Sequence, residues 1–260
     1  MNLLTDSGYL CGMRLKIKEE KWFQANFLMS FFSIFVKSVF YFVVFKAVFL
    51  NSEKVDADEI TLYYIIINIV ALSIATAQSV SCCHMEDINT GAIIPHLLRP
   101  SNYMIVNYLN NLAPVVVRLL FNFLLIFGAS CLLGQAIQVF TIFLGFFSVL
   151  LGFTILYLIQ AVIGCFSVWF HDITRFRDVV YSLLMLLGGR LIPSDLLFSG
   201  LKQFVYYTPL PYVYDVPVKI IMGSGYPTMM AVQIFWTVIF GAAYVFLFNC
   251  FVKHNIEFGG

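Results

Sequence analysis

The chain has 260 residues, of which 61% are hydrophobic and 11% are charged, and its formal net charge is +1. Soluble domains are about 45–50% apolar and about 25% charged, so this composition excludes an ordinary soluble fold. The small net charge also excludes a bulk electrostatic attraction to nucleic acid. At about 20 apolar residues per spanning helix, the length accommodates about six helices. We therefore expect residues 1–260 to form a single all-α transmembrane domain with six spans.

The N-terminal residues 1–26 carry several cations and no early apolar core, which is not typical of a cleaved signal peptide. They are expected to lie at the membrane interface on the cytoplasmic side. The first span is predicted at Phe27–Leu50 and contains Lys37, whose charge near the membrane centre costs about 2.5–3.5 kcal/mol on insertion scales. Lys37 either pairs with a neighbouring helix or lines a polar translocation path, and both interpretations stay open.

The second span is predicted at Ile60–Cys82, after a solvated acidic loop at Asn51–Glu59. Its small and hydroxyl side chains are typical of a face packed against other helices. Gln78 lies among them and is a second candidate for the translocation path.

The segment His84–Tyr103 follows and is the most polar interruption between the apolar runs. Apolar residues recur within it at steps of three to four, at Ile88, Ala92, Ile93 and Leu97, which predicts a helix with one apolar face. Acidic residues near its start suit the positive end of a helix dipole. The segment is predicted either to bind a partner protein at the membrane face or, alternatively, only to anchor the loop.

Four further spans follow the same apolar pattern. Residues 103–113 are rich in asparagine and are expected at the interface, and the third span is predicted to begin at Pro114, because proline suits a first helical turn. Arg118, one turn inside, is expected to reach back to the headgroups. The remaining spans are predicted at Val139–Trp169, from near Phe176 to Gly188-Gly189 and at Met229–Phe251.

Residues 188–227 are too apolar for a solvated loop and too long for an ordinary connection. They contain four internal prolines, Pro193, Pro209, Pro211 and Pro217. Ser194-Asp195 is expected to cap a helix over Leu196–Tyr206. The pattern predicts a broken helical hairpin that re-enters the membrane from outside, where protein or a wet cavity must surround its backbone.

The distribution of cations sets the expected orientation. One side of a six-span topology receives eight of them and the other side four, namely Lys54, Arg190, Lys202 and Lys219. The positive-inside rule then places both termini in the cytoplasm of a multi-pass cell-membrane protein.

Catalytic and metal-binding patterns were also sought. The chain has no GxxxxGK[ST] loop for ATP, no HExxH and no GxSxG, so we expect no enzymatic activity and no cofactor within it. The adjacent Cys82-Cys83 lacks the spacing of a CxxC site, and the six cysteines are interpreted as reduced packing residues rather than metal ligands.

Several short patterns resemble ABC-2 type transporter permeases, in particular the six-span branch. Gly91 followed by Leu97-Leu98-Arg99-Pro100 is similar to the coupling segment of that branch. The resemblance continues through Trp169-Phe170, Ile192-Pro193, the prolines at 209, 211 and 217, and the ending Glu257-Phe258-Gly259-Gly260. Two departures are Pro95, which interrupts the expected coupling helix, and Gly188-Gly189, where the family commonly has Ser-Gly.

The resemblance implies a function and partners. It implies that Glu86–Leu98 docks on a cytoplasmic ABC ATPase, present in two copies, which binds ATP and Mg²⁺. Two permeases would form the path, either as a homodimer or with a sister permease. The residues expected to couple the permease to the ATPase are Glu86, Asp87, Gly91, Ile93, Leu97, Leu98, Arg99 and Pro100.

The function expected from these patterns is export of a hydrophobic or amphipathic cargo (a lipid, peptide or natural product) by alternating access. Two alternatives from other classes stay open. One is an intramembrane enzyme that acts on lipid, which needs convergent polar groups at membrane depth. The other is a passive channel or scaffold, which lacks a ring-forming charged filter in this sequence.

Overall fold

The computed structural model describes residues 57–97, 102–132, 138–223 and 226–252, together with the isolated positions 32, 36, 40 and 43. Every regular element within these ranges is a helix and none is a strand, so the all-α prediction is confirmed there. Most of the predicted first span, including Lys37, lies outside the described residues. The four isolated positions, Phe32, Val36, Phe40 and Val43, are helical and exposed.

The second predicted span is one bent element. It consists of α3 (Ala57–Ser73), the 3-10 turn η1 (Ala75–Ser79) and α4 (Val80–Asn89). The two halves are inclined by 54° to each other. The element continues past the predicted end at Cys82, so His84 belongs to α4 and is buried rather than part of a polar insert. The reason is packing, because the backbone of Gly164 lies directly against the Cβ of His84.

The next helix, α6 (Tyr103–Leu132), corrects the predicted third span. It begins at Tyr103, eleven residues before Pro114, which lies inside the helix. The Asn102 side chain accepts the backbone N–H of Met104 at 3.0 Å and so supports the helix start. Further along, Asn111 donates to the Asn107 carbonyl at 2.9 Å. The asparagines that suggested an interfacial stretch are thus bonded within the helix.

The second half of the chain builds the centre of the bundle. Its elements are α7 (Val139–Cys165), η2 (Phe166–Val168), α8 (Thr174–Leu187), η3 (Ser194–Leu196), α9 (Ser199–Tyr206), α10 (Asp215–Ile221), α11 (Tyr226–Leu247) and the π-helical turn η4 (Phe248–Val252). Helix α7 packs against α4, α10 and α11 and carries many of the buried residues.

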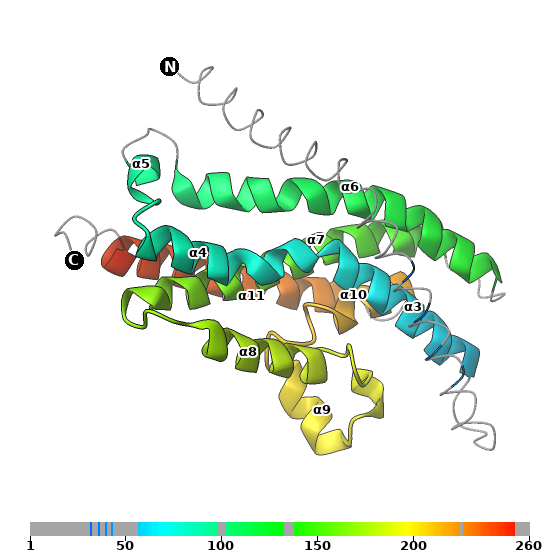
Figure 1. Ribbon diagram of the computed structural model, residues 1–260. Coiled ribbons are helices and arrows are strands. Elements are labelled where there is room, and N and C mark those ends of the chain that lie inside the picture. The colour runs from blue at the N-terminus through cyan, green and yellow to red at the C-terminus, as the bar shows by residue number, and fades with distance from the viewer. Residues whose placement is uncertain are drawn as a thin grey trace.

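The bundle has two distinct ends (Figure 1). One end holds the short helix α5 (Ile94–Leu97), the start of α6 and the turn between α7 and α8. The start of α3 and the end of α6 lie at the opposite end. The two ends of α6 are therefore separated by the length of the bundle.

Three of the described helices are long and apolar enough to cross a membrane, over Tyr103–Gly128, Val139–Val168 and Thr228–Cys250. The bent element over Glu59–Ser73 and Ala75–Asn89 makes a fourth if its two halves count as one crossing. The fifth predicted span is the 14-residue α8. At 1.5 Å per residue it is about 21 Å long, less than the hydrocarbon core of about 30 Å. The count of six spans stays a prediction.

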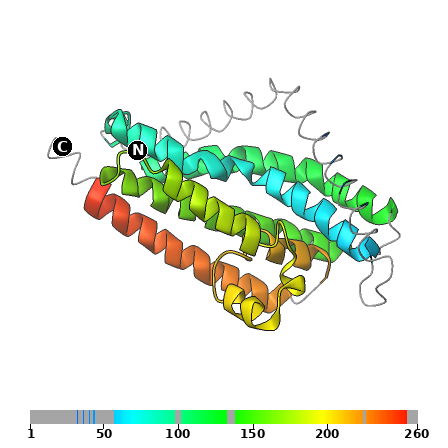
Figure 2. The same ribbon diagram turned by 60° about the horizontal axis from the view of Figure 1, so that its bottom comes forward.

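The chain between α8 and α11, residues 188–227, is called the hairpin below. Residues 211–221 of the hairpin are all buried, and they pack along the first half of α7. A side chain at Gly152 would lie 2.7 Å from the Val213 carbonyl, and the Thr141 hydroxyl donates to the Ile221 carbonyl at 3.1 Å. Figure 2 shows α9 lying beside the first half of α11.

Candidate functional site

The predicted coupling segment, Glu86–Leu98, is a broken helix. Helix α4 ends at Asn89, and Gly91 adopts a left-handed conformation with φ of 72°. The Ile93 amide reaches back to the Asp87 carbonyl at 3.1 Å, which closes the turn. Pro95 then occupies the first turn of α5, where a missing N–H costs nothing. The interruption is confirmed, but Gly91 causes it rather than Pro95.

The predicted coupling residues differ in their surroundings. Glu86 is exposed and Gly91 is half-buried, whereas Ile93 is buried in the core. The exposed apolar surface at this tip comes instead from Ala92, Ile94 and Pro95. The structure describes Leu97 as part of α5 without its side chain, and Leu98, Arg99 and Pro100 lie outside the described residues.

Asp87 is held by the neighbouring helix. The Tyr103 hydroxyl donates to Asp87 Oδ2 at 2.6 Å, and Asn107 donates to the Tyr103 oxygen at 3.2 Å. The Tyr103 ring also stacks on Phe248 with centroids 5.6 Å apart. Asp87 is therefore linked through Tyr103 to α6 and to η4, and its Oδ2 is already engaged in a bond within the chain.

Two further contacts brace the segment. The His84 Nδ1 atom lies 3.0 Å from the Val80 carbonyl, which can only accept, so Nδ1 carries a hydrogen. In the neutral ring, Nε2 then accepts the hydrogen of the Tyr244 hydroxyl, 2.8 Å away on α11. Asn89 donates to the His171 carbonyl at 2.9 Å, in the turn between α7 and α8. A displacement of the segment would therefore act on α6, α11 and the α7–α8 turn together.

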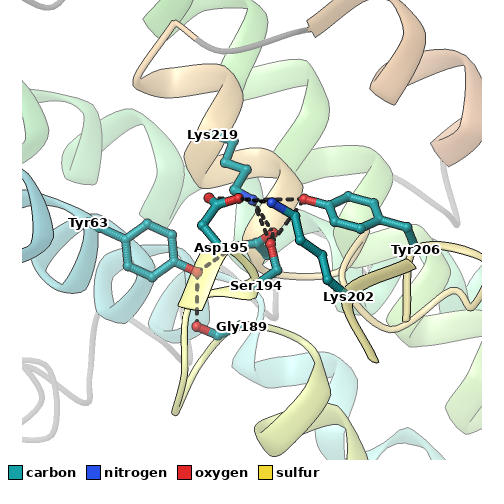
Figure 3. Close-up of polar contacts among 8 residues, drawn as sticks. Tyr63, Gly189, Ser194, Asp195, Lys202, Tyr206 and Lys219 are labelled. Atoms are coloured by element: carbon teal, nitrogen blue, oxygen red, sulfur yellow. Dashed lines mark hydrogen bonds and ion pairs between the residues drawn. The ribbon is translucent and has the colours of Figure 1, made fainter. Parts of the chain in front are cut away.

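At the hairpin, charged and hydroxyl groups from four elements converge, which we call the hairpin cluster (Figure 3). Its members are Tyr63 on α3, Ser194 and Asp195 in η3, Lys202 and Tyr206 on α9, and Asp215 and Lys219 on α10. All except Asp195 are at least partly withdrawn from solvent, and Asp215 is fully buried.

The buried carboxylate of Asp215 is fully satisfied. Its Oδ1 accepts the Tyr63 hydroxyl at 2.6 Å, and its Oδ2 accepts the Ser194 hydroxyl at 2.7 Å. The Lys219 ammonium lies 3.1 Å from the same Oδ2, one helical turn further along α10. Tyr63 also lies 2.9 Å from the Gly189 carbonyl, so its single hydrogen is shared between two acceptors. These bonds fasten the hairpin to α3.

Lys219 connects this buried carboxylate to the surface. Its Nζ contacts Asp195 Oδ2 at 2.8 Å and donates to the Tyr206 hydroxyl at 2.7 Å. Lys202 binds the other oxygen of Asp195 at 2.7 Å. Partial burial raises the pKa of Asp195, but the hydrogen bonds from Lys202 and Lys219 outweigh it, so the pKa lies below its ordinary value.

One prediction about this region is wrong. Ser194 and Asp195 do not cap a helix, because η3 ends at Leu196 and α9 begins at Ser199 without a side-chain cap. Their polar groups bond to Asp215 and to the two lysines instead. The four prolines that suggested the broken hairpin are at least partly buried. Pro193, Pro211 and Pro217 are buried, and Pro209 is half-buried.

Polar side chains of α6 bond to α3 next to the bend between α3 and η1. Arg118 of α6 is half-buried, and its Nη1 donates to the Leu72 carbonyl at 3.4 Å. Its reach to the headgroups stays a prediction. Asn122 donates to the Ser73 hydroxyl at 2.8 Å. Gln78, the predicted path residue, lies half-buried in η1. The bend frees backbone carbonyls from helical bonding, which explains why α6 presents polar side chains here.

Sequence reasoning missed the hairpin cluster. Asp215 and Lys219 form a charged pair four residues apart within an otherwise apolar stretch, and that spacing was the available signal. The contributions of Tyr63 and Ser194 had no local signal. Within the described residues, no group of His, Cys, Asp or Glu could hold a metal ion.

These observations define a helical, multi-pass membrane protein with a braced surface segment at one end and a buried polar cluster toward the other. A model of the family described as ABC-2 family transporter protein matches residues 31–257. The chain therefore belongs to the ABC-2 family of transporter proteins, as the resemblance indicated. No curated protein matches the chain significantly. The family is the membrane component of ABC transporters, which act with a separate ABC ATPase.

Proposed function

We propose that this chain is the permease of an ATP-driven exporter for a hydrophobic or amphipathic cargo. Two permeases, identical or sister subunits, would form the path, and two ATPase subunits would bind ATP and Mg²⁺. Both termini would lie in the cytoplasm of the cell membrane. The observation that carries this proposal is the exposed tip Thr90–Pro95, mounted on α4 and braced by three parts of the same bundle end.

The tip has the geometry of a docking element. Glu86 is exposed beside the apolar Ala92, Ile94 and Pro95, so a partner groove would meet both a charge and a small apolar surface. The bracing bonds mean that a push on the tip moves helices rather than a loose loop. This supports transmission of ATP-driven motion to the path through the segment Glu86–Leu98.

The hairpin supports the proposed re-entrant arrangement. Val213 packs against Gly152, which lies thirteen residues after the start of α7. This contact is therefore about 20 Å along the helix axis from that start. Its backbone is surrounded by α3, α7 and α11 rather than by lipid, as a re-entrant segment requires. With the cytoplasmic tip at the other end of the bundle, the hairpin would face the exterior.

An intramembrane enzyme is less well supported. The hairpin cluster brings the Ser194 hydroxyl to the Lys219 ammonium, a pair that some hydrolases use as nucleophile and base. Here the ammonium lies between two carboxylates, Asp195 and Asp215, and Ser194 is fully buried and donates to Asp215. A lysine held in its charged form cannot take the proton of the serine.

The proposal is tested by co-purification with the ABC ATPase encoded nearest to it. Ile94→Asp would place a charge on the exposed tip, and Val179→Asp, an exposed α8 position, is the matched control. We expect I94D to lose ATPase association and stimulation, whereas V179D retains both. Full association and transport by I94D, E86A and R99A would contradict the coupling role.

A further inference from the structure

A groove of about 630 Å³ lies between α9 of the hairpin and α11. Its volume is within the range of small-molecule sites, about 300–1,000 Å³. The lining residues are Ser199, Lys202, Gln203, Tyr206, Tyr207, Tyr212, Val232, Phe235 and Trp236. The wall is therefore mainly aromatic and aliphatic, with a polar margin on α9.

The groove opens on an exposed, apolar surface of the chain. Its α11 wall belongs to the candidate span Thr228–Cys250, most of which is exposed in this chain. Helix α9 and its two flanking residues expose large aromatic side chains, with Phe198 72%, Phe204 63% and Tyr207 75% exposed. Exposed aromatic residues of this kind concentrate at the headgroup level of membranes. With α11 spanning the membrane, the groove would border lipid acyl chains and headgroups.

The charged side chain that lines the groove indicates which kind of lipid headgroup would bind there. Among the described residues that line the groove, Lys202 is the one cation and none is acidic. Its ammonium has three donors, and Asp195 accepts one of them at 2.7 Å. Ser199, one turn earlier on α9, adds a hydroxyl at the same margin. A phosphate above an apolar chain matches this arrangement of one cation, one hydroxyl and an aromatic trough.

We propose that the groove between α9 and α11 binds a membrane phospholipid from the leaflet that the hairpin faces. One acyl chain lies against Val232, Phe235 and Trp236, and the phosphate lies against Lys202. Tyr206 lines the groove and also bonds to Lys219 and Ser194. The bound lipid therefore contacts the hairpin cluster through Lys202 and through the Tyr206 ring. The proposal does not depend on which cargo the transporter moves.

The lipid site can be tested with Trp236 as the reporter, because it lines the groove. The full chain, with Trp22→Phe and Trp169→Phe to leave one tryptophan, is placed in detergent micelles with dibrominated phospholipids that quench on contact. We expect saturable quenching at a mole fraction of dibromo-phosphatidylglycerol about tenfold lower than of dibromo-phosphatidylcholine. Lys202→Gln should abolish this preference, and Lys202→Arg should keep it.

A second pair of variants tests the groove itself. Val232→Phe places a ring in the groove and should weaken quenching by both lipids, whereas Val238→Phe, an exposed α11 position that does not line the groove, should leave it unchanged. Equal quenching by both lipids that neither K202Q nor V232F alters would show unspecific surface lipid and overturn the proposal. It would also be overturned if Trp236 were shielded from lipid and soluble quenchers alike, as a second copy of the chain seated there would cause.

Discussion

Replacing Lys219 with methionine tests whether the hairpin cluster holds the hairpin in place. Methionine keeps the length of the side chain and removes the ammonium, so the fully buried Asp215 loses its cation. Removing one partner of a buried ion pair costs about 3–5 kcal/mol, because the other charge is left uncompensated. The matched control is Lys202→Met, which breaks the exposed pair with Asp195 and should cost at most about 1 kcal/mol.

The assay is thermal unfolding of the purified permease in one detergent, followed with a thiol-reactive dye. For a protein of this size, 1 kcal/mol corresponds to about 2–4 °C, so K219M should lower the Tm by about 6–20 °C and K202M by at most about 4 °C. Adding Asp215→Asn to K219M removes the stranded carboxylate and should recover part of the loss. Limited proteolysis should locate the loosened region between α8 and α11.

The reasoning is refuted if K219M and K202M melt within 2 °C of each other. It is also refuted if the double variant melts lower than K219M alone, because the stranded charge would then not be the cause of the loss. Either result would mean that the apolar contacts of α10 with α7 hold the hairpin without help from the cluster.

Three further predictions concern the same region. Tyr63→Phe removes a 2.6 Å bond to the buried carboxylate and should destabilise the protein by about 1.5–3 kcal/mol, measured as above; an unchanged Tm would contradict the link to α3. Gly152→Ala places a methyl group 2.7 Å from the Val213 carbonyl and should lower the Tm, whereas Gly128→Ala, with open space around it, should raise it slightly; the opposite order would disprove close packing of the hairpin on α7. Because the pKa of Asp195 is lowered, its stabilising contribution is complete above its ordinary value of 3.8 and is lost as the pH falls through the lower folded value. Protease protection of the hairpin should therefore fall more steeply below pH 3.8 in the wild type than in Asp195→Asn, and parallel curves would argue against this contribution.

Some helices were predicted accurately from the sequence and others were not, and the difference has physical reasons. The spans around α7 and α11 were located to within a few residues, because each is a continuous apolar run of the required length. The start of α6 was misplaced, since the asparagines that suggest an interface bond to carbonyls one turn back in the helix. Composition alone cannot distinguish these two uses of asparagine.

The residues of the candidate sites also differ in how far the sequence predicts them. The exposed tip of the coupling segment follows from local signals, namely an acidic start, a glycine and a proline. The hairpin cluster does not, because Tyr63 and Asp215 are separated by 152 residues and meet only when the hairpin packs on α3. Ser194 was assigned to a helix cap for the same reason, since its distant partner was not visible in the local pattern.

The 54° bend between α3 and η1 divides one element between two packing groups. Helix α3 packs with α6 and α10, whereas α4 packs with α7, so the two halves have different neighbours. Arg118 and Asn122 bond to Leu72 and Ser73, immediately before the bend. The two halves of the element can therefore respond differently to a displacement: one of α4 would act first on α7, whereas the bonds to Leu72 and Ser73 tie the end of α3 to α6.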